Sequence, residues 1–337
     1  MMTSGKQAAP LATIVMYHRV QPPRSGPLGR LNALDVSAFR EQLAYIRRHY
    51  TPVSAADLVG AADGGSPLPP RPIVLTFDDG YRDHYQHVLP LLDQFSIPGV
   101  FFPVSSAMLD RQLLDVNKIQ YILAMSDEMM PLVEAIDAAI EYEQREVGSP
   151  SPADYRALWW KPSRWDPAPV VYVKRLLQHA LPESVRRPLT DTLFRDIVSA
   201  DEVAFTADLY MTAAEGRELR AAGMTVGAHG DRHLRLTTLS KEEQAREIDG
   251  ALRVLDAVGA SRQQFAYSYA NGDHDGTSVD LLRARGCGVA FTTRPDLACV
   301  AAAGILTMPR IDANDLPAQA DAPPNSWTTR AAEHAED

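Results

Sequence analysis

The chain has 337 residues, of which 45% are hydrophobic and 23% charged, and its formal net charge is −10. These proportions are ordinary for a soluble globular protein, and the acidic balance gives no indication of a nucleic-acid-binding surface. The two cysteines, Cys287 and Cys299, are too few for a disulfide framework or a Cys-x-x-Cys metal site.

The N-terminal residues show neither a secretion signal nor a membrane span. Residues 1–10 contain one lysine and no apolar run, and the apolar stretch 11–20 is interrupted by His18 and Arg19. Such a stretch is too short and too polar for either kind of segment. We therefore expect a cytoplasmic protein without a membrane-spanning segment.

Seven short apolar segments are typical of buried strands in a parallel sheet. Helical patterns lie between them. Phe39, Leu43 and Ile46 fall at helical spacing, and capping boxes at residues 212–215 and 240–243 open two later helices. This alternation predicts an α/β barrel or a doubly wound sheet. The expected strands are residues 14–18, 73–77, 99–104, 225–229, 264–269, 288–292 and 304–311.

One long stretch, residues 105–210, interrupts the alternation. It is rich in helical patterns and carries proline-rich breaks near residues 148–152 and 166–169. About 100 residues are too many for a simple connection, so we expect a helical insert after the third strand. The expected divisions are a barrel of residues 1–104 and 211–317, the insert 105–210 and a mobile tail 318–337.

Polar residues with catalytic chemistry follow the ends of the expected strands. In parallel α/β folds these ends meet at one face, where functional residues gather, so we expect the side chains to lie close together. The residues concerned are His18, Asp78, Asp79, His229, His233 and Tyr269.

Two of these clusters together indicate a metal site. His229 and His233 are four residues apart, so on a helical turn they project to the same side. Asp78 and Asp79 are consecutive, so one carboxylate can complete a three-ligand site while the other faces a bound water. An HxxxH pair alone is weak evidence, and Asp-Asp-Gly is also a turn sequence. Their joint occurrence at strand ends favours metal-dependent hydrolysis.

These motifs resemble those of the polysaccharide deacetylases, carbohydrate esterase family 4. The resemblance covers roughly residues 11–104 and 210–312 and leaves out the insert. The residues that carry it are Thr76-Phe77-Asp78-Asp79-Gly80, the pair His229 and His233, the aromatic strand end 265–269, and the flanks 81–83, 89–92, 99–102 and 219–229.

The resemblance implies a distorted (β/α)7 barrel that binds a divalent metal through Asp79, His229 and His233. Zn²⁺ is expected first, with Co²⁺, Ni²⁺, Mn²⁺ and Fe²⁺ as alternatives. The resemblance also implies that Asp78 is the general base and that the backbone N–H of Tyr269 helps to form the oxyanion hole. The reaction would be hydrolysis of an N-acyl amide, typically N-acetyl, on an amino sugar, a nucleotide sugar or a glycan.

The sequence departs from the family pattern in two places. Ala266 and Ser268 stand where the family usually has arginine and proline, and the last expected strand lacks the usual leucine-x-x-histidine. We expect Arg310 to replace the missing arginine as partner of Asp78. We expect His18 to replace the late histidine as general acid, as in an early-histidine variant resembling poly-N-acetylglucosamine deacetylases.

Other interpretations stay open. The chain could be an amidase for a non-sugar cyclic amide or ureide, or a non-catalytic carbohydrate-binding protein on the same barrel, although a retired site usually loses a ligand. In the insert, Trp159, Trp160 and Trp165 could form a core or a lid that stacks on sugar rings. His84 and His87, which follow the Asp-Asp-Gly motif, are expected to be solvated or to pack on a helix.

Overall fold

The computed structural model of the chain describes residues 10–163 and 166–333. By its internal contacts the chain divides into two compact units. Unit 1 takes in the described part of Met1–Pro22, Ala33–Gln112 and Ala207–Asp337, and unit 2 comprises Pro23–Asn32 and Leu113–Thr206. Unit 2 thus begins at Leu113 rather than residue 105, ends at Thr206 rather than 210, and includes an early segment that the sequence analysis assigned to the barrel.

Parallel strands form the centre of unit 1, which confirms the α/β class. β1 (Leu11–Tyr17), β5 (Pro72–Asp79), β6 (Gly99–Pro103) and β7 (Thr225–Val226) pair in that order. All residues of β5 are buried, as its continuous apolar sequence predicts. Shorter strands extend this sheet: β4 (Thr51–Pro52) on β5, and β11 (Ile311–Asp312) and the antiparallel β10 (Ala298–Cys299) on β1.

A second parallel pair, β8 (Phe265–Ser268) and β9 (Cys287–Phe291), continues the arrangement. Single bridges join Ala228 to Tyr267 and Phe291 to Met308. Gly227 allows the chain to leave β6 for β8, because a Cβ there would lie 2.4 Å from the carbonyl oxygen of Ala266. Among the described residues, β8 and β9 are thus joined to the strands of the larger sheet by single bridges and not by a continuous ladder. A further short pair, β2 (Val20–Gln21) with β3 (Leu34–Asp35), lies outside that sheet.

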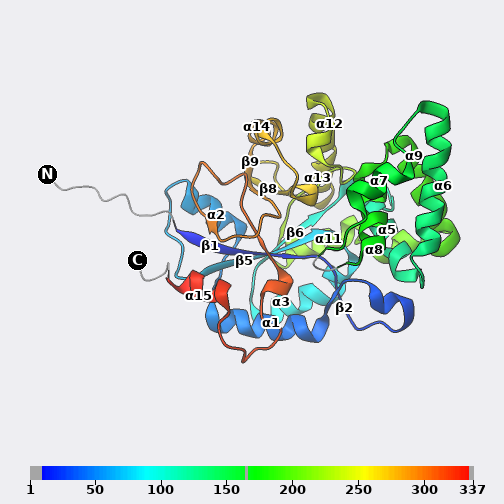
Figure 1. Cartoon of the computed structure of the whole chain (residues 1–337). Coiled ribbons are helices and arrows are strands. Elements are labelled where there is room, and N and C mark those ends of the chain that lie inside the picture. The colour runs from blue at the N-terminus through cyan, green and yellow to red at the C-terminus, as the bar shows by residue number, and fades with distance from the viewer. Residues whose placement is uncertain (1–9, 164–165, 334–337) are drawn as a thin grey trace. The chain divides into compact units, whose positions relative to one another are not determined.

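Helices cover the strands of unit 1 (Figure 1), with α1 and α3 near β1 and β5, and α12 and α14 near β8 and β9. The capping boxes expected at Thr212 and Ser240 are both present and open α11 and α12. The helices are α1 (Val36–His49), α2 (Ala55–Ala62), α3 (Leu89–Phe95), α4 (Ser105–Leu109), α11 (Ala213–Ala221), α12 (Lys241–Ala251), α13 (Arg253–Val258), α14 (Gly276–Ala284) and α15 (Ser326–Glu333).

Unit 2 is helical. Its helices are α5 (Asp115–Met125), α6 (Met130–Val147), α7 (Pro152–Trp159), α8 (Ala168–Arg175), α9 (Glu183–Ile197) and α10 (Glu202–Leu209), the last of which crosses the boundary with unit 1. Within the part of the chain that the structure describes, the large exposed hydrophobic side chains all belong to unit 2. They are Met130, Tyr142, Leu158 and Val203.

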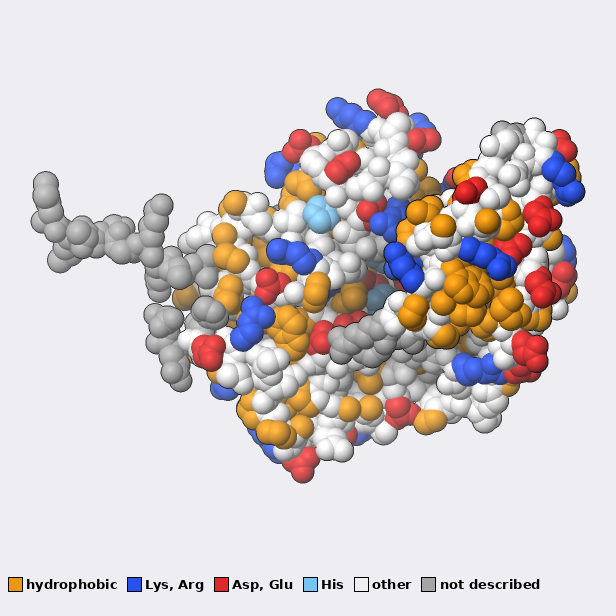
Figure 2. Space-filling view, in the orientation of Figure 1, with side chains coloured by type: hydrophobic (Ala, Val, Ile, Leu, Met, Phe, Trp, Pro, Cys, Tyr) orange, Lys and Arg blue, Asp and Glu red, His pale blue; other side chains and the backbone are white. Residues whose placement is uncertain are grey.

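The face drawn in Figure 2 carries acidic and basic side chains interspersed with one another, and hydrophobic side chains gather over α7 and α8. None of the helices within residues 10–163 and 166–333 combines the length and the apolarity that a membrane-spanning helix needs.

Two expectations about the C-terminal region are wrong. Most of the expected strand 304–311 is a tight turn in which the N–H of Thr307 donates to Gly304, and Pro309 has no N–H to donate to a ladder. The mobile tail is wrong for α15, because Thr328 is buried and bonds to the hydroxyls of Tyr45 and Tyr50 at 2.8 and 2.9 Å. Residues 334–337 lie outside the described part of the chain.

Candidate active site

β5 delivers the two carboxylates. Asp78 and Asp79 are its last residues and both are buried. Asp79 and Gly80 each have a φ of 72°, so the chain turns sharply in the left-handed region directly after Asp78. A Cβ at Gly80 would lie 2.6 Å from the Cβ of Pro103, so this turn requires glycine. The turn sends the two carboxylates in different directions, as their adjacency at a strand end suggested.

The two histidines lie on a loop, which corrects the expectation of a helical turn. Gly230 and His233 both have positive φ, at 80° and 59°. The loop is held by backbone bonds from α4, because the N–H of Ser106 donates to the carbonyl of Asp231 at 2.9 Å. On the other side, Glu247 of α12 accepts from the backbone N–H of residues 232 and 234 at 2.9 and 3.2 Å. These contacts, rather than helical spacing, direct both imidazoles inward.

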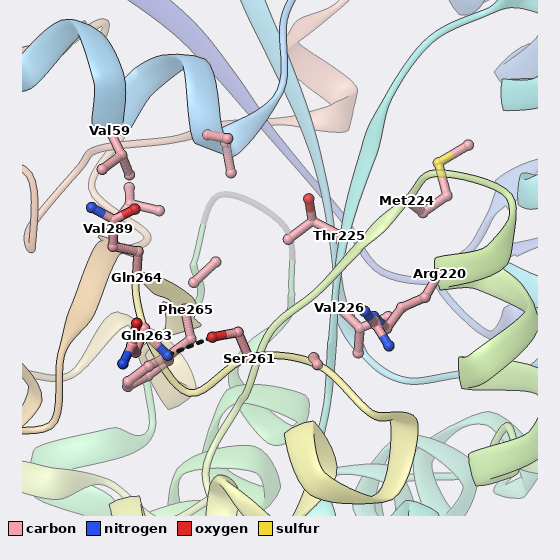
Figure 3. A pocket seen from close by; sticks show the side chains of 14 residues that line it. Val59, Arg220, Met224, Thr225, Val226, Ser261, Gln263, Gln264, Phe265 and Val289 are labelled. Carbon is pink, nitrogen blue, oxygen red and sulfur yellow. Dashed lines mark hydrogen bonds between the residues drawn. The ribbon is translucent and has the colours of Figure 1, made fainter. Parts of the chain in front are cut away.

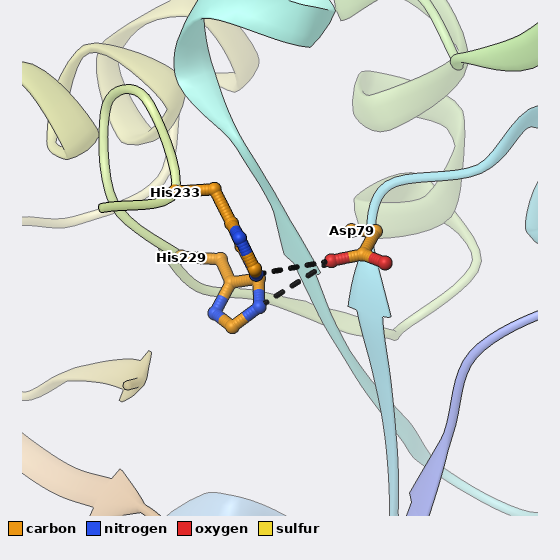
Figure 4. A group of neighbouring side chains, drawn as sticks. All are labelled: Asp79, His229 and His233. Carbon is orange, nitrogen blue, oxygen red and sulfur yellow. Dashed lines mark ion pairs between the residues drawn. The ribbon is translucent and has the colours of Figure 1, made fainter. Parts of the chain in front are cut away.

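Asp79, His229 and His233 converge (Figure 4). The Oδ1 atom of Asp79 lies 3.5 Å from Nε2 of His229 and 3.6 Å from Nε2 of His233. This oxygen is buried and has no hydrogen-bond partner among the described residues. An unpaired buried carboxylate oxygen beside two imidazole nitrogens is the donor set that a divalent metal such as Zn²⁺ binds. The residues present therefore fit the expected metal.

The surroundings of His229 and His233 set the orientation and the pKa of each imidazole. The Nδ1 atom of His229 donates to the carbonyl of Ser268 at 2.8 Å, which leaves the lone pair of Nε2 toward Asp79. Burial lowers the pKa of His229, but the charges of Asp78 and Asp79 outweigh burial and raise it overall. Burial and the charge of His229 lower the pKa of His233 to about 4, so this imidazole is neutral near pH 7. Burial raises the pKa of Asp79, yet His229 and His233 hold it well below its usual value.

Arg310 binds Asp78, as expected from the sequence. Its Nη1 and Nη2 atoms donate to Oδ1 and Oδ2 of Asp78 at 2.9 and 2.7 Å, in a buried bidentate pair. The remaining donors reach the carbonyl of Thr292 and the hydroxyls of Thr76 and Ser268 at 2.8–3.0 Å. Burial opposes ionisation of Asp78, but the Arg310 charge and then His229 lower its pKa to about 2. Asp78 is thus an ionised carboxylate beside the three-residue cluster.

His18 follows β1 directly and its side chain is exposed at the same end of the strands. It is near enough to the two aspartates to add to the lowering of their pKa values, after the larger effects named above. Its carbonyl accepts a hydrogen bond from Nε2 of His84 at 2.5 Å. His84 itself is buried and packs against Phe77 and Tyr81. His18 thus lies at the end of the strand next to β5, and its role stays a prediction, whereas His84 is a packing residue.

Tyr269 does not have the expected role. Its backbone N–H donates to the carbonyl of Phe291 at 3.0 Å, and its hydroxyl donates to the carbonyl of Leu306 at 3.0 Å. An N–H group has one hydrogen, and here the β8–β9 pairing uses it. The oxyanion-hole assignment of this N–H is therefore wrong in the structure as it stands.

Three contributors escaped the sequence analysis. The hydroxyl of Tyr81 donates to Oδ2 of Asp79 at 2.7 Å. Ser268 supplies the carbonyl that orients His229 and a hydroxyl to the Asp78–Arg310 pair. Glu247 holds the histidine loop. Tyr81 could have been found from its place directly after the Asp-Asp-Gly motif, whereas no local pattern marks Glu247.

The tryptophans of unit 2 pack against its own residues. Trp160 lies 5.4 Å from the ring of Tyr172, with the Arg156 guanidinium 5.0 Å from its centroid. Trp159 lies 5.6 Å from His179. Both are half-buried, and Trp165 lies outside the described residues. These contacts agree with the interpretation as a core of the insert.

A cavity of about 250 Å³ opens at the other ends of the strands (Figure 3). It is lined by Val59 of α2, Thr225 of β7, Phe265 of β8 and neighbouring residues. The cavity lies where β7 and β8 begin, whereas the loop that carries His229 and His233 follows the other end of β7. The cavity is therefore separate from the Asp79 cluster. None of the candidate catalytic residues lines it.

Comparisons with known proteins agree with the motifs. Residues 65–134 and 195–290 match the family model described as polysaccharide deacetylase, which confirms the family resemblance. Over 93 residues the chain is 42% identical to the poly-beta-1,6-N-acetyl-D-glucosamine N-deacetylase of Escherichia coli K12. That match covers 27% of this chain and only 14% of the length of that relative.

Two solved structures share the fold. IcaB from Ammonifex degensii has a TM-score of 0.54 at 17% identity, over 97% of this chain and 98% of its own. The Streptococcus pyogenes deacetylase PplD, in complex with acetate, has a TM-score of 0.54 at 16% identity, over 92% and 94% of the two chains. At these identities the likeness is one of fold.

Proposed function

Because the chain carries a polysaccharide deacetylase domain, we propose that it removes the N-acyl group, acetyl first, from an amino sugar in a glycan or glycan precursor. The carrying observation is the cluster of buried Asp79 and His229 with half-buried His233, beside the ionised Asp78. The name of the Escherichia coli relative makes poly-N-acetylglucosamine the first substrate to test. We also propose that the strands of unit 1 form one distorted (β/α)7 barrel, with unit 2 inserted after β6.

Asp79, His229 and His233 would hold the metal, with Zn²⁺ favoured by the mixed nitrogen and oxygen ligands and Co²⁺, Ni²⁺, Mn²⁺ and Fe²⁺ as alternatives. A metal bound there supplies a water of lowered pKa and polarises the acyl carbonyl. His229 is supported in this role by its bond to Ser268, which fixes its tautomer.

Asp78 is the proposed general base. Its Oδ2 atom is bonded to both Arg310 and Ser268, whereas Oδ1 is bonded to Arg310 only. A carboxylate oxygen has two lone pairs, so Oδ1 is the atom that we assign to accept a proton from the attacking water. Arg310 keeps this carboxylate ionised and fixes its orientation before the substrate arrives.

His18 is the proposed general acid that protonates the leaving amine. The support for this role is its exposed position directly after β1, the strand that pairs with β5. An imidazole can donate a proton at this step and regain one from solvent.

The direct test measures acetate release by the metal-loaded protein from β-1,6-linked N-acetylglucosamine oligomers, chitooligosaccharides and nucleotide-linked N-acetylglucosamine. A cyclic ureide serves as the non-sugar substrate. We expect turnover of an acetylated sugar only, with Asp79→Ala losing the metal. Asp78→Asn should keep the metal and lose about 10²–10⁴-fold in turnover.

Turnover of the ureide alone would establish the amidase alternative. Binding of the oligomers by metal-free and metal-loaded protein, without acetate release from any sugar, would establish the non-catalytic alternative. Full metal content in Asp79→Ala would overturn the ligand assignment.

A further inference from the structure

Tyr81, the residue directly after the Asp-Asp-Gly turn, bonds to the carboxylate oxygen of Asp79 that does not face the histidines. The hydroxyl of Tyr81 donates to Oδ2 of Asp79 at 2.7 Å, while Oδ1 of the same carboxylate faces His229 and His233. Tyr81 is buried. The hydroxyl is the donor in this bond, because an ionised carboxylate oxygen can only accept. One hydrogen bond thus distinguishes the two oxygens of the carboxylate.

The ring of Tyr81 is held in place from its faces. The Arg19 guanidinium lies 4.3 Å from the ring centroid, and Tyr210 stacks on it at 6.2 Å with an interplanar angle of 14°. A cation over an aromatic face is an attractive contact, and Arg19 is itself buried. The hydroxyl of Tyr81 therefore has little freedom to leave Asp79.

The backbone adds a third restraint. Tyr81 and Tyr210 form an antiparallel bridge, and the N–H of Met211 donates to the carbonyl of Gly80 at 3.0 Å. Backbone hydrogen bonds thus join residues 210–211, which follow unit 2 in the chain, to Gly80 and Tyr81. Left-handed backbone at the non-glycine residue Asp79 is conformationally costly and persists where the surroundings enforce it.

We propose that Tyr81 is the positioning residue of the metal ligand Asp79: its hydroxyl occupies Oδ2 and leaves Oδ1 as the one oxygen that binds the metal. Outer hydrogen bonds of this kind orient a ligand, and their loss typically lowers metal affinity about 10–100-fold. This inference rests on the proposed metal site and adds a residue that neither the motif nor the ligand cluster includes.

The test compares two variants that each lose one buried phenol hydroxyl. Tyr81→Phe removes the bond to Asp79, and the control Tyr17→Phe, at the end of β1, removes a bond to Gln42 of α1. Both tyrosines are 1% exposed. We expect Tyr81→Phe to weaken Zn²⁺ binding about 10–100-fold in a chelator competition. The visible absorption spectrum of its Co²⁺ form should also change, because Asp79 can then turn, whereas Tyr17→Phe should match wild type in both.

If Tyr81 has only a structural role, both variants should lose similar thermal stability, and both should match wild type in metal affinity and Co²⁺ spectrum. This result would overturn the proposal. If Tyr81→Phe does not fold, a crystal structure of the Zn²⁺-loaded wild type decides. Binding of Asp79 through Oδ1 alone, with Tyr81 on Oδ2, supports the proposal, and binding through Oδ2 or both oxygens overturns it. Wild type that binds no divalent metal would remove the metal site itself.

Discussion

Asp78 and Asp79 are chain neighbours with the same side chain, yet their surroundings give them different chemistry. Asp78 meets a guanidinium that uses both of its oxygens. Asp79 meets a phenol on one oxygen and two imidazoles on the other. Adjacent side chains at a strand end point to opposite sides, and the left-handed turn at Asp79 and Gly80 then takes the chain out of β5. Assignment of base and ligand thus follows from partners rather than from sequence position.

The buried Asp78–Arg310 pair leads to a prediction about stability. Arg310→Met would leave Asp78 buried without its partner, and loss of one member of a buried pair typically costs about 3–5 kcal/mol. The control Arg283→Met breaks an exposed pair with Asp280, which is worth less than about 1 kcal/mol. Urea unfolding at pH 7, with chelator throughout, measures both free energies of unfolding.

The pH dependence of this prediction has a definite sign. The folded pKa of Asp78 is about 2, below the usual 3.8, so its contribution is present above about pH 4 and is lost as the pH falls toward 2. In Arg310→Met, burial without the guanidinium raises the pKa, so protonation relieves the variant on acidification. The difference in unfolding free energy between wild type and Arg310→Met should therefore narrow between pH 7 and pH 4. A constant difference, or one no larger than in Arg283→Met, would contradict the paired state of Asp78.

At the scale of elements, the histidine loop depends on helices that carry no ligand. α4 and α12 hold its backbone on either side, through Ser106 and Glu247. An HxxxH pair on a helix needs no such support, because helical geometry places both side chains on one face. Here His229 and His233 keep the four-residue spacing, but contacts from α4 and α12, distant in sequence, fix the positions of the two side chains.

Glu247 allows this dependence to be measured. Glu247→Ala removes the acceptor of two loop N–H groups, so His233 should lose its fixed position and Zn²⁺ affinity should fall about 10-fold or more. Glu247→Gln keeps an acceptor oxygen and should stay within about threefold of wild type. Chelator competition gives both affinities, with the melting temperature of the metal-free proteins as a check on folding. Equal affinities in Glu247→Ala and wild type would show that the loop holds itself.

What the sequence predicted at this scale follows from short-range physics. Continuous apolar runs located β5 and β6, capping boxes located α11 and α12, and the strand-end rule gathered Asp78, Asp79 and His229. The failures required information from distant residues. The partner of the Tyr269 N–H is Phe291, the exchange of partners at Gly227 depends on β8, and Glu247 acts on a loop through the fold alone. Arg310 was reached by asking which cation could replace a missing one.

At the scale of the whole chain, the residues that hold the histidine loop and the turn after Asp79 belong to unit 1. Ser105 and Ser106 hold the histidine loop, and Tyr210 and Met211 hold the turn after Asp79. All four fall in unit 1, although Ser105, Ser106 and Tyr210 lie in the expected insert 105–210. Deletion of the expected insert 105–210 would therefore remove supporting residues of unit 1 at both ends.

Two deletions should therefore behave differently. Replacing residues 113–206 and 23–32 by short linkers removes unit 2 and should leave Zn²⁺ affinity within about threefold of wild type. Replacing 105–210 also removes the supports of both ligand segments and should weaken binding about 10-fold or more, as loss of supporting contacts does elsewhere. Chelator competition and circular dichroism of both proteins check this. Equal binding by the two deletions would contradict the support role, and loss of turnover on oligomers in the narrow deletion would assign substrate contact to unit 2.

The distance along the chain between the ligands has a consequence for synthesis on the ribosome. His229 emerges about 150 residues after Asp79, a delay of roughly 10–30 s at common elongation rates. During that interval the larger segment of unit 2, Leu113–Thr206, is made, whereas the nascent carboxylates of β5 have neither imidazoles nor Arg310, which follows about 80 residues after His229. Metal capture by the proposed site would therefore be a late event in biogenesis, because a chain stalled on the ribosome before residue 229 lacks both histidines of that site.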